Sequence, residues 1–354
     1  MPPSVSSPLR RTCLRLAAAA FATAAACSPL AAAAQAVTPI KFVLDWKLQG
    51  VHAWFYLAQQ RGYFAQEKLD VQIDAGDGSA NTVNKVMAGA YQAGFGDVNA
   101  IIQNAATRPA GTVPVMVYMV YNRAPFAIIT KASSTIRSLK DLEGRTLGSP
   151  AGGAAMKMFP ALAELNGVDP AKVRWTHMAP NLQEQMLLKG EVDASAVFSV
   201  TSYMNLVGLG VDPDKDIRWF DYTRDGIALY GNGVMVSPAL LKDKPQAVAG
   251  LVRAIHKGMR DAVADPDAAI DALVKQEPLL DRALEKRRML YALREVILTP
   301  EAQSLGVGDV DDARMRKAIA QVQQAFELQR APQPGEVFDR RFLPARAERQ
   351  LVLK

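Results

Sequence analysis

The stretch IKFVLDWKLQGVHAWFYLAQQRG, residues 40–62, places a strand directly before a helix. Ile40 to Asp45 is a short apolar run that predicts a strand, and residues 51–60 predict a helix that ends at Gly62. The same order continues with a strand at 69–74, a helix at 79–87 with Ser79 as its cap, a buried strand at 93–96 and a central strand at 113–121. This alternation predicts an α/β fold with a mostly parallel sheet covered by helices.

A second unit with the same alternation follows. Strands are predicted at 126–130, 145–149, 173–178 and 194–199, and helices at 154–166 and 182–189. The segments MAGAYQA (87–93) and LKGEVDA (188–194) both end a helix at glycine and enter a strand shortly afterwards. Such punctuation is common in α/β proteins, but its repetition favours two similar lobes.

The rest of the sequence leaves the second unit and does not build a third. One more strand is expected at 234–237, and nearly everything beyond is predicted to be helical, with Pro238 and Pro245 opening helices. We therefore expect the tail to pack back on the first lobe and the chain to cross between lobes twice, near 120–125 and 230–233, which forms a hinge. The predicted division is a signal peptide at 1–36, a first lobe at 37–121 and 232–354, and a second lobe at 122–231.

The composition is that of a soluble globular chain. Of 354 residues, 49% are hydrophobic and 21% charged, which excludes intrinsic disorder and collagen-like structure. The formal charge of +6 falls to about +3 without the three leader arginines, since 38 basic residues then face 35 acidic ones. With no basic stripe interleaved with aromatics, this excludes a nucleic-acid partner, and the charged run at 285–288 is expected to cover an exposed helix face.

The first 36 residues have the features of an export signal. Arginines at 10, 11 and 15 precede an alanine-rich apolar run from about 16 to 27, and Ala34-Gln35-Ala36 is a typical cleavage site. Cleavage there leaves a mature chain that starts at Val37, and we expect it in the periplasm. The paired arginines leave both the Sec and the Tat export routes open.

Both cysteines, Cys13 and Cys27, lie in this leader. Cys27 is a lipid-attachment candidate, but Ala24 stands where such sites usually have leucine, so a lipoprotein is the less favoured alternative. The mature chain would have no cysteine, which excludes disulfides, thiolate nucleophiles, zinc–cysteine sites and iron–sulfur clusters. No apolar run is long enough to span a membrane.

Candidate ligand-binding residues stand at strand ends, because ligands of open parallel α/β sheets bind beyond the carboxyl ends of the strands, beside helix N-termini. Asp97 and Asn99 have an alternative role as helix caps, Gly152 and Gly153 as turn residues, and Trp46 as a core residue. The predicted ligand-binding residues are Asp45, Trp46, His52, Ser79, Asn81, Asp97, Asn99, Ser149, Gly152, Gly153, Tyr230 and Asn232.

Catalytic and metal-binding signatures are scarce. The chain has no G-x-S-x-G elbow, no phosphate-binding G-x-x-x-x-G-K-[ST] and no G-x-G-x-x-G after the first strand. Three scattered histidines form no metal-ligand cluster, and His177 and His256 are expected to be structural. We predict a binding protein with no catalysis, no cofactor and no metal.

The motif Leu44-Asp45-Trp46, followed by His52, LAQ (57–59) and GYF (62–64), resembles the opening of the NMT1/THI5-like family. This family joins the thiamine-pyrimidine precursor synthases of yeast with periplasmic substrate-binding proteins of ABC importers. The similarity covers most of the mature chain, and its later motifs are shared with type II periplasmic binding proteins for sulfonates (SsuA-type) and nitrate. These later motifs are LDV (69–71), DLEGR (141–145), GEVDA (190–194) and ADP (264–266).

The resemblance implies a monomeric, two-lobed type II periplasmic binding protein that closes on a small molecule and delivers it to an ABC permease. Asp45 and Asp97 would accept hydrogen bonds from ligand N–H groups, and Trp46 would stack on a planar ring, so the expected ligand is a heterocycle like a thiamine-pyrimidine precursor. The other predicted residues supply polar contacts (His52, Asn81), meet an anionic or carbonyl edge (Ser149, Gly152, Gly153) or lie at the hinge (Tyr230, Asn232).

Other functions stay open. An alkanesulfonate, taurine or nitrate carrier would need basic residues in the cleft, for which Lys47 and Arg123 are candidates. An enzyme on the same scaffold, such as a pyrimidine synthase or a dehydratase, would turn the ligand over. Against it, this chain has residues 229–233 where the synthases carry a cysteine-rich motif, and Gly96 where they carry a lysine. A sensor that reports to a membrane receptor would share the pocket.

Overall fold

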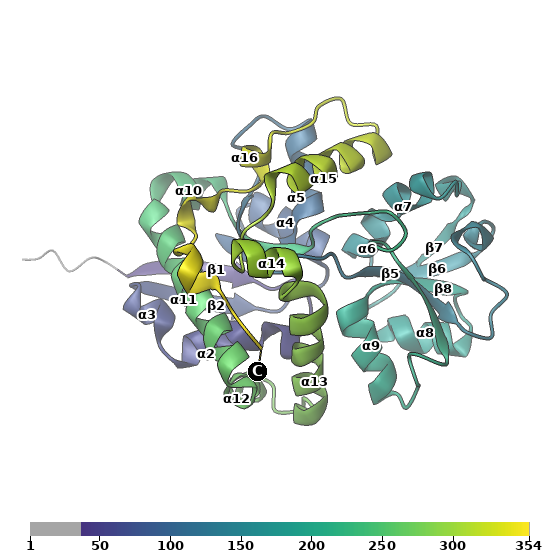
Figure 1. Ribbon diagram of the computed structural model, residues 1–354, viewed down its shortest axis with the longest axis horizontal. Coiled ribbons are helices and arrows are strands. Elements are labelled where there is room, and N and C mark those ends of the chain that lie inside the picture. The colour runs from purple at the N-terminus through teal and green to yellow at the C-terminus, as the bar shows by residue number, and fades with distance from the viewer. Residues whose placement is uncertain (1–36, 354) are drawn as a thin grey trace, which may run out of the picture. The chain divides into compact units, whose positions relative to one another are not determined.

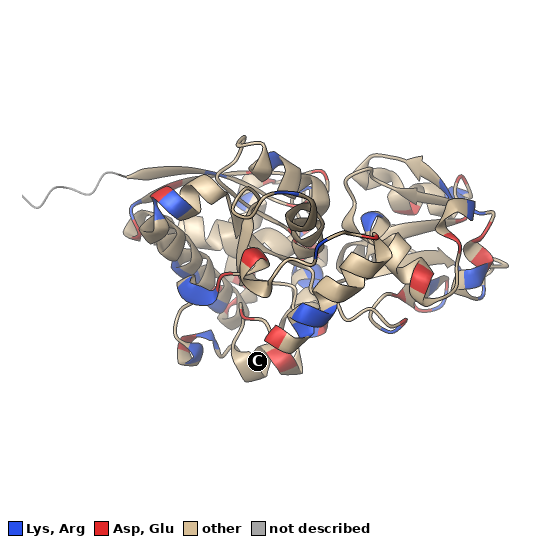
Figure 2. Cartoon of the chain, turned by 90° about the horizontal axis from the view of Figure 1, so that it is seen from above, with Lys and Arg blue, Asp and Glu red and all other residues tan. Residues whose placement is uncertain are grey.

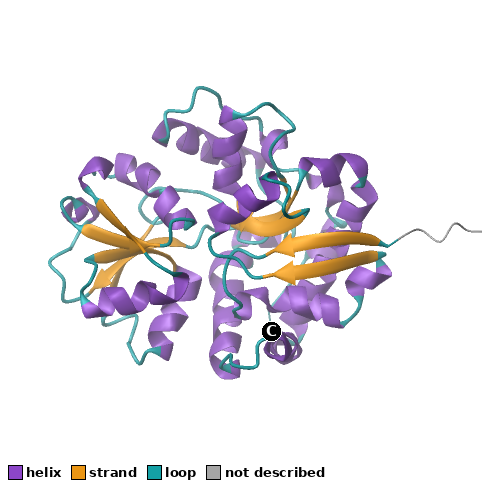
Figure 3. Cartoon of the chain, turned by 180° about the vertical axis from the view of Figure 1, so that it is seen from behind, coloured by secondary structure: helices purple, strands orange, loops and turns teal. Residues whose placement is uncertain are grey.

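The computed structural model describes residues 37–353, which form two five-stranded sheets flanked by helices (Figures 1 and 3). The predicted α/β fold with two sheets is confirmed. The predicted signal peptide, its cleavage site and Cys27 lie outside the described residues. Within these residues, no helix is long and apolar enough to cross a membrane.

The first sheet takes four strands from the start of the chain and one from much later. Its order is β2-β1-β3-β10-β4. β1 pairs in parallel with β2 and β3, whereas β10 runs antiparallel to both of its neighbours. The strands are β1 (Thr38–Val43), β2 (Leu69–Asp74), β3 (Ala93–Asp97), β4 (Val115–Met119) and β10 (Asn232–Val236).

The second sheet has the order β7-β6-β8-β5-β9, and β5 is its one antiparallel strand. β9 lies at an edge and was not predicted, because Arg218 and Asp221 interrupt the apolar run that identifies a buried strand. In both sheets the antiparallel strand is the one that follows a crossing of the chain. The strands are β5 (Phe126–Lys131), β6 (Thr146–Ser149), β7 (Arg174–His177), β8 (Ala194–Phe198) and β9 (Ile217–Asp221).

Two predicted helix features are wrong. The helix expected at 154–166 is broken near Met158, because Pro160 has no N–H to donate to the Met156 carbonyl. Gly78, and not Ser79, occupies the N-cap of α4. The helices before the tail are α2 (Ala53–Gln60), α3 (Tyr63–Gln66), α4 (Ser79–Met87), α5 (Val98–Thr107), α6 (Ala154–Lys157), α7 (Phe159–Leu165), α8 (Gln183–Lys189) and α9 (Ser199–Gly208).

The helical tail packs on both sheets' helices. α11 and α12 contact α2 of the first sheet, whereas α13 also contacts α9, and α15 contacts both α5 and α7. The tail therefore ties together elements that the sequence assigned to separate lobes. Its helices are α10 (Pro238–Asp243), α11 (Pro245–Ala264), α12 (Pro266–Gln276), α13 (Arg282–Ala292), α14 (Pro300–Leu305), α15 (Asp312–Ala325) and α16 (Pro334–Val337).

The charged run on α13 is not a fully solvated face, which corrects the sequence prediction. Lys286 does pair with Asp267 on α12, in keeping with the mixed charges that cover the surface helices (Figure 2). Glu285 and Arg288, however, are buried and paired with each other at 2.9 Å. Arg288 also donates to the Thr201 carbonyl of α9 at 2.6 Å, so this ion pair belongs to the contact between the tail and the second sheet.

One arginine holds the two segments in which the chain passes between the sheets. Arg314 of α15 donates through Nη2 to the carbonyls of Asn122 and Leu229, at 2.8 and 2.9 Å; Asn122 lies in the first crossing segment and Leu229 directly before the second. Its guanidinium also pairs with Glu301 and lies 4.0 Å from the centre of the Tyr230 ring. These contacts fix the spacing of the two crossings.

Replacing Arg314 with methionine should lower the free energy of unfolding by about 3 kcal/mol, because buried carbonyls and Glu301 lose a charged donor. Arg316→Met, on an exposed position of the same helix, is the matched control and should change little. Urea unfolding followed by circular dichroism measures both. Equal effects of the two substitutions would show that Arg314 does not hold the crossings.

Candidate functional site

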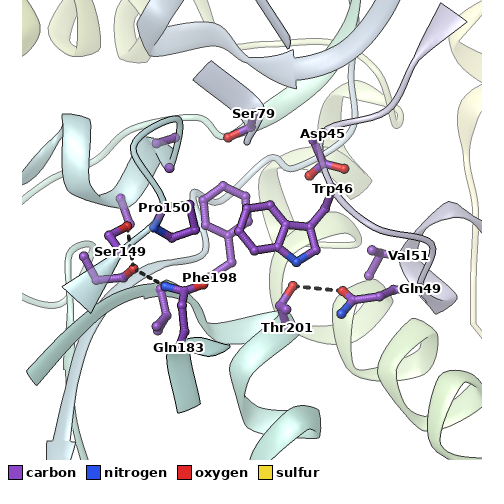
Figure 4. Close-up of a pocket in the computed structure, with 15 residues that line it drawn as sticks. Asp45, Trp46, Gln49, Val51, Ser79, Ser149, Pro150, Gln183, Phe198 and Thr201 are labelled. Carbon is purple, nitrogen blue, oxygen red and sulfur yellow. Dashed lines mark hydrogen bonds between the residues drawn. The ribbon is translucent and has the colours of Figure 1, made fainter. Parts of the chain in front are cut away.

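A cavity of about 30 Å³ lies where the two sheets face each other (Figure 4). It is bounded by strand ends and helix starts: Asp45 follows β1, Ser149 ends β6 and Phe198 ends β8, while α4, α6 and α9 begin beside it. This is the position expected of a ligand site in open α/β sheets. The lining residues are Asp45, Trp46, Gln49, Val51, Ser79, Ser149, Pro150, Gly153, Ala154, Ala155, Gln183, Ala196, Val197, Phe198 and Thr201.

Asp45 is the charged side chain of this lining, and it is held from behind. Its Oδ1 lies 2.7 Å from His52 Nε2, and its Oδ2 accepts a hydrogen bond of 2.7 Å from Asn232 Nδ2. The Gln49 backbone N–H donates to His52 Nδ1, so Nδ1 carries no proton and Nε2–H is the donor to Asp45. His52 is therefore a neutral support that positions the carboxylate.

The wall from the second sheet presents acceptors. Ser149 Oγ and Gln183 Nε2 both donate to the Ala196 carbonyl, at 3.3 and 2.9 Å (Figure 4). The hydroxyl proton of Ser149 is used in this bond, which leaves oxygen lone pairs of Ser149 and Gln183 for the cavity.

Each side of the cavity contributes one aromatic ring, and a hydrogen bond joins the two sides. Trp46 comes from the loop after β1, and Phe198 from the end of β8, so each sheet contributes one ring (Figure 4). Thr201 Oγ1 donates to Gln49 Oε1 at 3.2 Å across the same gap. Nearby, the backbone of Gly152 packs on α4, where an added Cβ would lie only 2.8 Å from the Cβ of Asn81.

The structure brings five of the twelve predicted ligand-binding residues into the lining: Asp45, Trp46, Ser79, Ser149 and Gly153. His52 and Asn232 lie behind Asp45 and contact it. Asn81 and Gly152 line a separate, more open pocket. Asp97, Asn99 and Tyr230 form a buried group, in which Asn99 Nδ2 donates to Asp97 Oδ1 and to the Tyr230 carbonyl, both at 2.8 Å.

Sequence reasoning missed Gln49, Gln183, Phe198 and Thr201. Phe198 is the last residue of β8, so its place at a strand end is the signal that could have identified it. Gln183 and Thr201 lie in the first turns of α8 and α9, and only the position of those helices brings them to the cavity.

No lysine, arginine or histidine lines this cavity among residues 37–353. Lys47 lines a neighbouring groove, and Arg123 a pocket beside α9 and β9. The described part of the chain also contains no group of three or more His, Cys, Asp or Glu residues that could hold a metal ion. His256 is buried and hydrogen-bonded to Tyr118 at 2.9 Å, a structural role.

Asp97 caps α5 from a fully buried position. Its Oδ2 accepts from the Ala100 N–H at 3.0 Å, yet burial raises the pKa of Asp97 to about 7. Since the unfolded chain has the ordinary pKa of about 3.9, the folded state binds the extra proton between these values. The stability that this proton provides is present below pH 4 and is lost as the pH rises through 7.

Asp97→Asn removes the titration and keeps a residue that can cap a helix. Relative to this variant, the wild-type protein should lose up to about 4 kcal/mol of stability between pH 4 and pH 7. Thermal unfolding of both proteins across this range measures the difference. A wild-type minus variant difference that stays constant with pH would contradict the assignment.

The family described as NMT1/THI5 like matches residues 49–269. The riboflavin-binding protein RibY of Chloroflexus aurantiacus is 26% identical, over 68% of this chain and 67% of RibY. The formylaminopyrimidine-binding protein of Halalkalibacterium halodurans is 25% identical, over 69% of this chain and 72% of that protein.

Another relative is an enzyme. The 4-amino-5-hydroxymethyl-2-methylpyrimidine phosphate synthase of Legionella pneumophila is 21% identical, over 86% of this chain and 92% of the synthase. Among solved structures, the alkanesulfonate-binding protein SsuA of Xanthomonas axonopodis pv. citri, bound to MOPS, superposes with a TM-score of 0.64 at 15% identity, over 85% of this chain and 96% of SsuA. This likeness shows that the chain has the periplasmic binding protein fold.

Proposed function

The chain belongs to the NMT1/THI5-like family, and from this premise we propose that it is the periplasmic solute-binding component of an ABC importer. It captures a small planar heterocycle, of the kind of a thiamine-pyrimidine precursor, between its two sheets and delivers it unchanged to an inner-membrane permease. It acts as a monomer, exported by a cleaved signal peptide. The relatives named for binding riboflavin and formylaminopyrimidine support this ligand class.

The observation that carries the proposal is the composition of the cavity wall. Trp46 and Phe198 offer aromatic surface from opposite sides, and Asp45 is the charged group among the described lining residues. A planar ring buried between such residues gains apolar contact and stacking, while the carboxylate accepts its N–H groups.

The same wall disfavours sulfonate, taurine and nitrate as ligands. A buried anion facing Asp45 would be repelled unless a cation stood between them. Lys47 and Arg123, the candidates for that cation, line other pockets.

Two features support release of the ligand unchanged. Asp45, the carboxylate among the described residues that line the cavity, is already bonded to His52 and Asn232, and these lining residues include no second acid or base that could complete a proton relay. Gly96, where the family resemblance implies a lysine in the synthases, is packed against Met235 and the Ser79 carbonyl. A Cβ there would lie 2.8 Å from that carbonyl oxygen, so no larger side chain fits without rearrangement.

Ligand entry requires the cavity to open. Its volume of about 30 Å³ is far below the roughly 150 Å³ of a cavity that takes up benzene. We propose that the crossing segments bend to separate the two sides, and that the ligand then favours closure by filling the gap between Trp46 and Phe198.

Trp46→Ala should abolish the thermal stabilisation produced by a heterocyclic ligand, whereas Trp46→Phe should retain most of it, because only the alanine loses the stacking surface. Native mass spectrometry of periplasmic protein first identifies any retained solute. A thermal-shift panel of pyrimidines, flavins, sulfonates and nitrate follows, in which a ligand at 100 times its Kd adds about 2.7 kcal/mol. Stabilisation by sulfonate or nitrate alone, or chemical change of a bound compound, would overturn the proposal.

Gly152→Ala should weaken ligand binding about tenfold and leave the unliganded protein's melting temperature nearly unchanged. The added methyl meets Asn81 only when the two sides are together, so it opposes closure and not folding. Gly335→Ala is the control, since a Cβ there meets nothing within 4 Å. Titration calorimetry compares the two variants, and equal affinities would contradict a role for this contact in closure.

A further inference from the structure

The Ser79 hydroxyl is a buried polar group with no partner. Its residue is 3% exposed and lines the cavity, and its Oγ has no hydrogen bond in the structure. A buried hydroxyl left unpaired costs about 1–3 kcal/mol, so one that faces a binding cavity is explained when the ligand supplies the partner.

The surroundings of Ser79 favour a ligand acceptor. Ser79 is the first residue of the nine-residue helix α4, whose N-cap is Gly78 and therefore provides no side chain to the first-turn N–H groups. The positive end of the helix dipole and these N–H groups favour an oxygen or nitrogen lone pair at this point.

A hydrogen-bond acceptor of the protein lies beside this donor. The Gly78 N–H donates to the Asp45 backbone carbonyl at 2.9 Å, which fixes the start of α4 against the Asp45 loop. The side chains of Ser79 and Asp45 both line the cavity (Figure 4). Asp45 accepts one bond at each oxygen, and a carboxylate has about four acceptor positions, so it can accept from a ligand as well.

From this pair we infer that Ser79 and Asp45 together recognise one edge of an uncharged heterocycle, on which a ring nitrogen or carbonyl oxygen stands next to an N–H group. The ligand's lone pair accepts from Ser79 Oγ, and its N–H donates to Asp45. Aminopyrimidines and the imide edge of flavins have this arrangement, whereas sulfonates and nitrate offer acceptors alone. The inference rests on the proposed function and narrows its ligand class.

The test removes each half of the edge. The probes are 4-amino-5-hydroxymethyl-2-methylpyrimidine, its analogue with CH in place of the ring nitrogen next to the amino group, and its analogue with methyl in place of the amino group. Calorimetry measures their binding to the wild type, Ser79→Ala and Ser195→Ala. Ser195 is the matched control, because its hydroxyl is also buried and unpaired but lies outside the cavity lining.

Ser79→Ala should bind the parent pyrimidine about tenfold more weakly and the CH analogue no differently from the wild type, because that analogue has no lone pair for Ser79. Its unliganded melting temperature should equal or exceed that of the wild type. Ser195→Ala should bind each probe with the same affinity as the wild type does. The inference would be overturned if Ser79→Ala lost affinity for both the parent pyrimidine and the CH analogue, or for neither of them. If the wild type bound no pyrimidine and riboflavin also failed to bind, the proposed function itself would fall.

Discussion

The buried carboxylate of Asp45 is the group on which the arrangement of the site depends. Placing a carboxylate in the interior is costly unless hydrogen bonds replace the lost water. His52, just before α2, and Asn232, at the start of β10, provide them. The need to pair this one charge thus links the end of β1 to β10, the strand that returns from the second sheet. The acceptor positions of the carboxylate that these two bonds leave unused face the cavity.

The tail helices bring a second set of compensated charges to the contact between the sheets. Arg288 satisfies Glu285 and reaches the Thr201 carbonyl, while Arg314 spans the two crossing segments. Both arginines lie after the last strand in the sequence. A region that appeared to be a helical cover for the first sheet therefore also determines how the second sheet is held.

The sequence was informative where structure is local. The apolar run that starts at residue 40 and the similar runs that follow it predicted the order of strands and helices. This was possible because an apolar run, or a glycine that ends a helix, spans only a few neighbouring residues. β9 was not predicted because an edge strand needs no continuous apolar run. The break near Met158 is a local effect of Pro160, which has no N–H to donate to the preceding turn.

Sites were harder to predict, since they are assembled from distant segments. Strand ends identified Asp45, Trp46, Ser79 and Ser149 as lining residues, but not that His52 and Asn232 lie behind Asp45. The burial of Glu285 and Arg288 could not be read from a charged helical run, because it depends on which helix packs against α13.

The place of β10 has a consequence for the order of assembly. It lies between β3 and β4 in the first sheet, yet it follows the whole of the second sheet in the chain. When residues 37–119 have emerged, their sheet still lacks an inner strand, and closing it requires a loop of more than a hundred residues, which is entropically costly. The uninterrupted segment from β5 to β9 needs no such partner. The second sheet can therefore form first and act as the spacer that brings β10 back, so that completion of the N-terminal half waits for the chain's later residues.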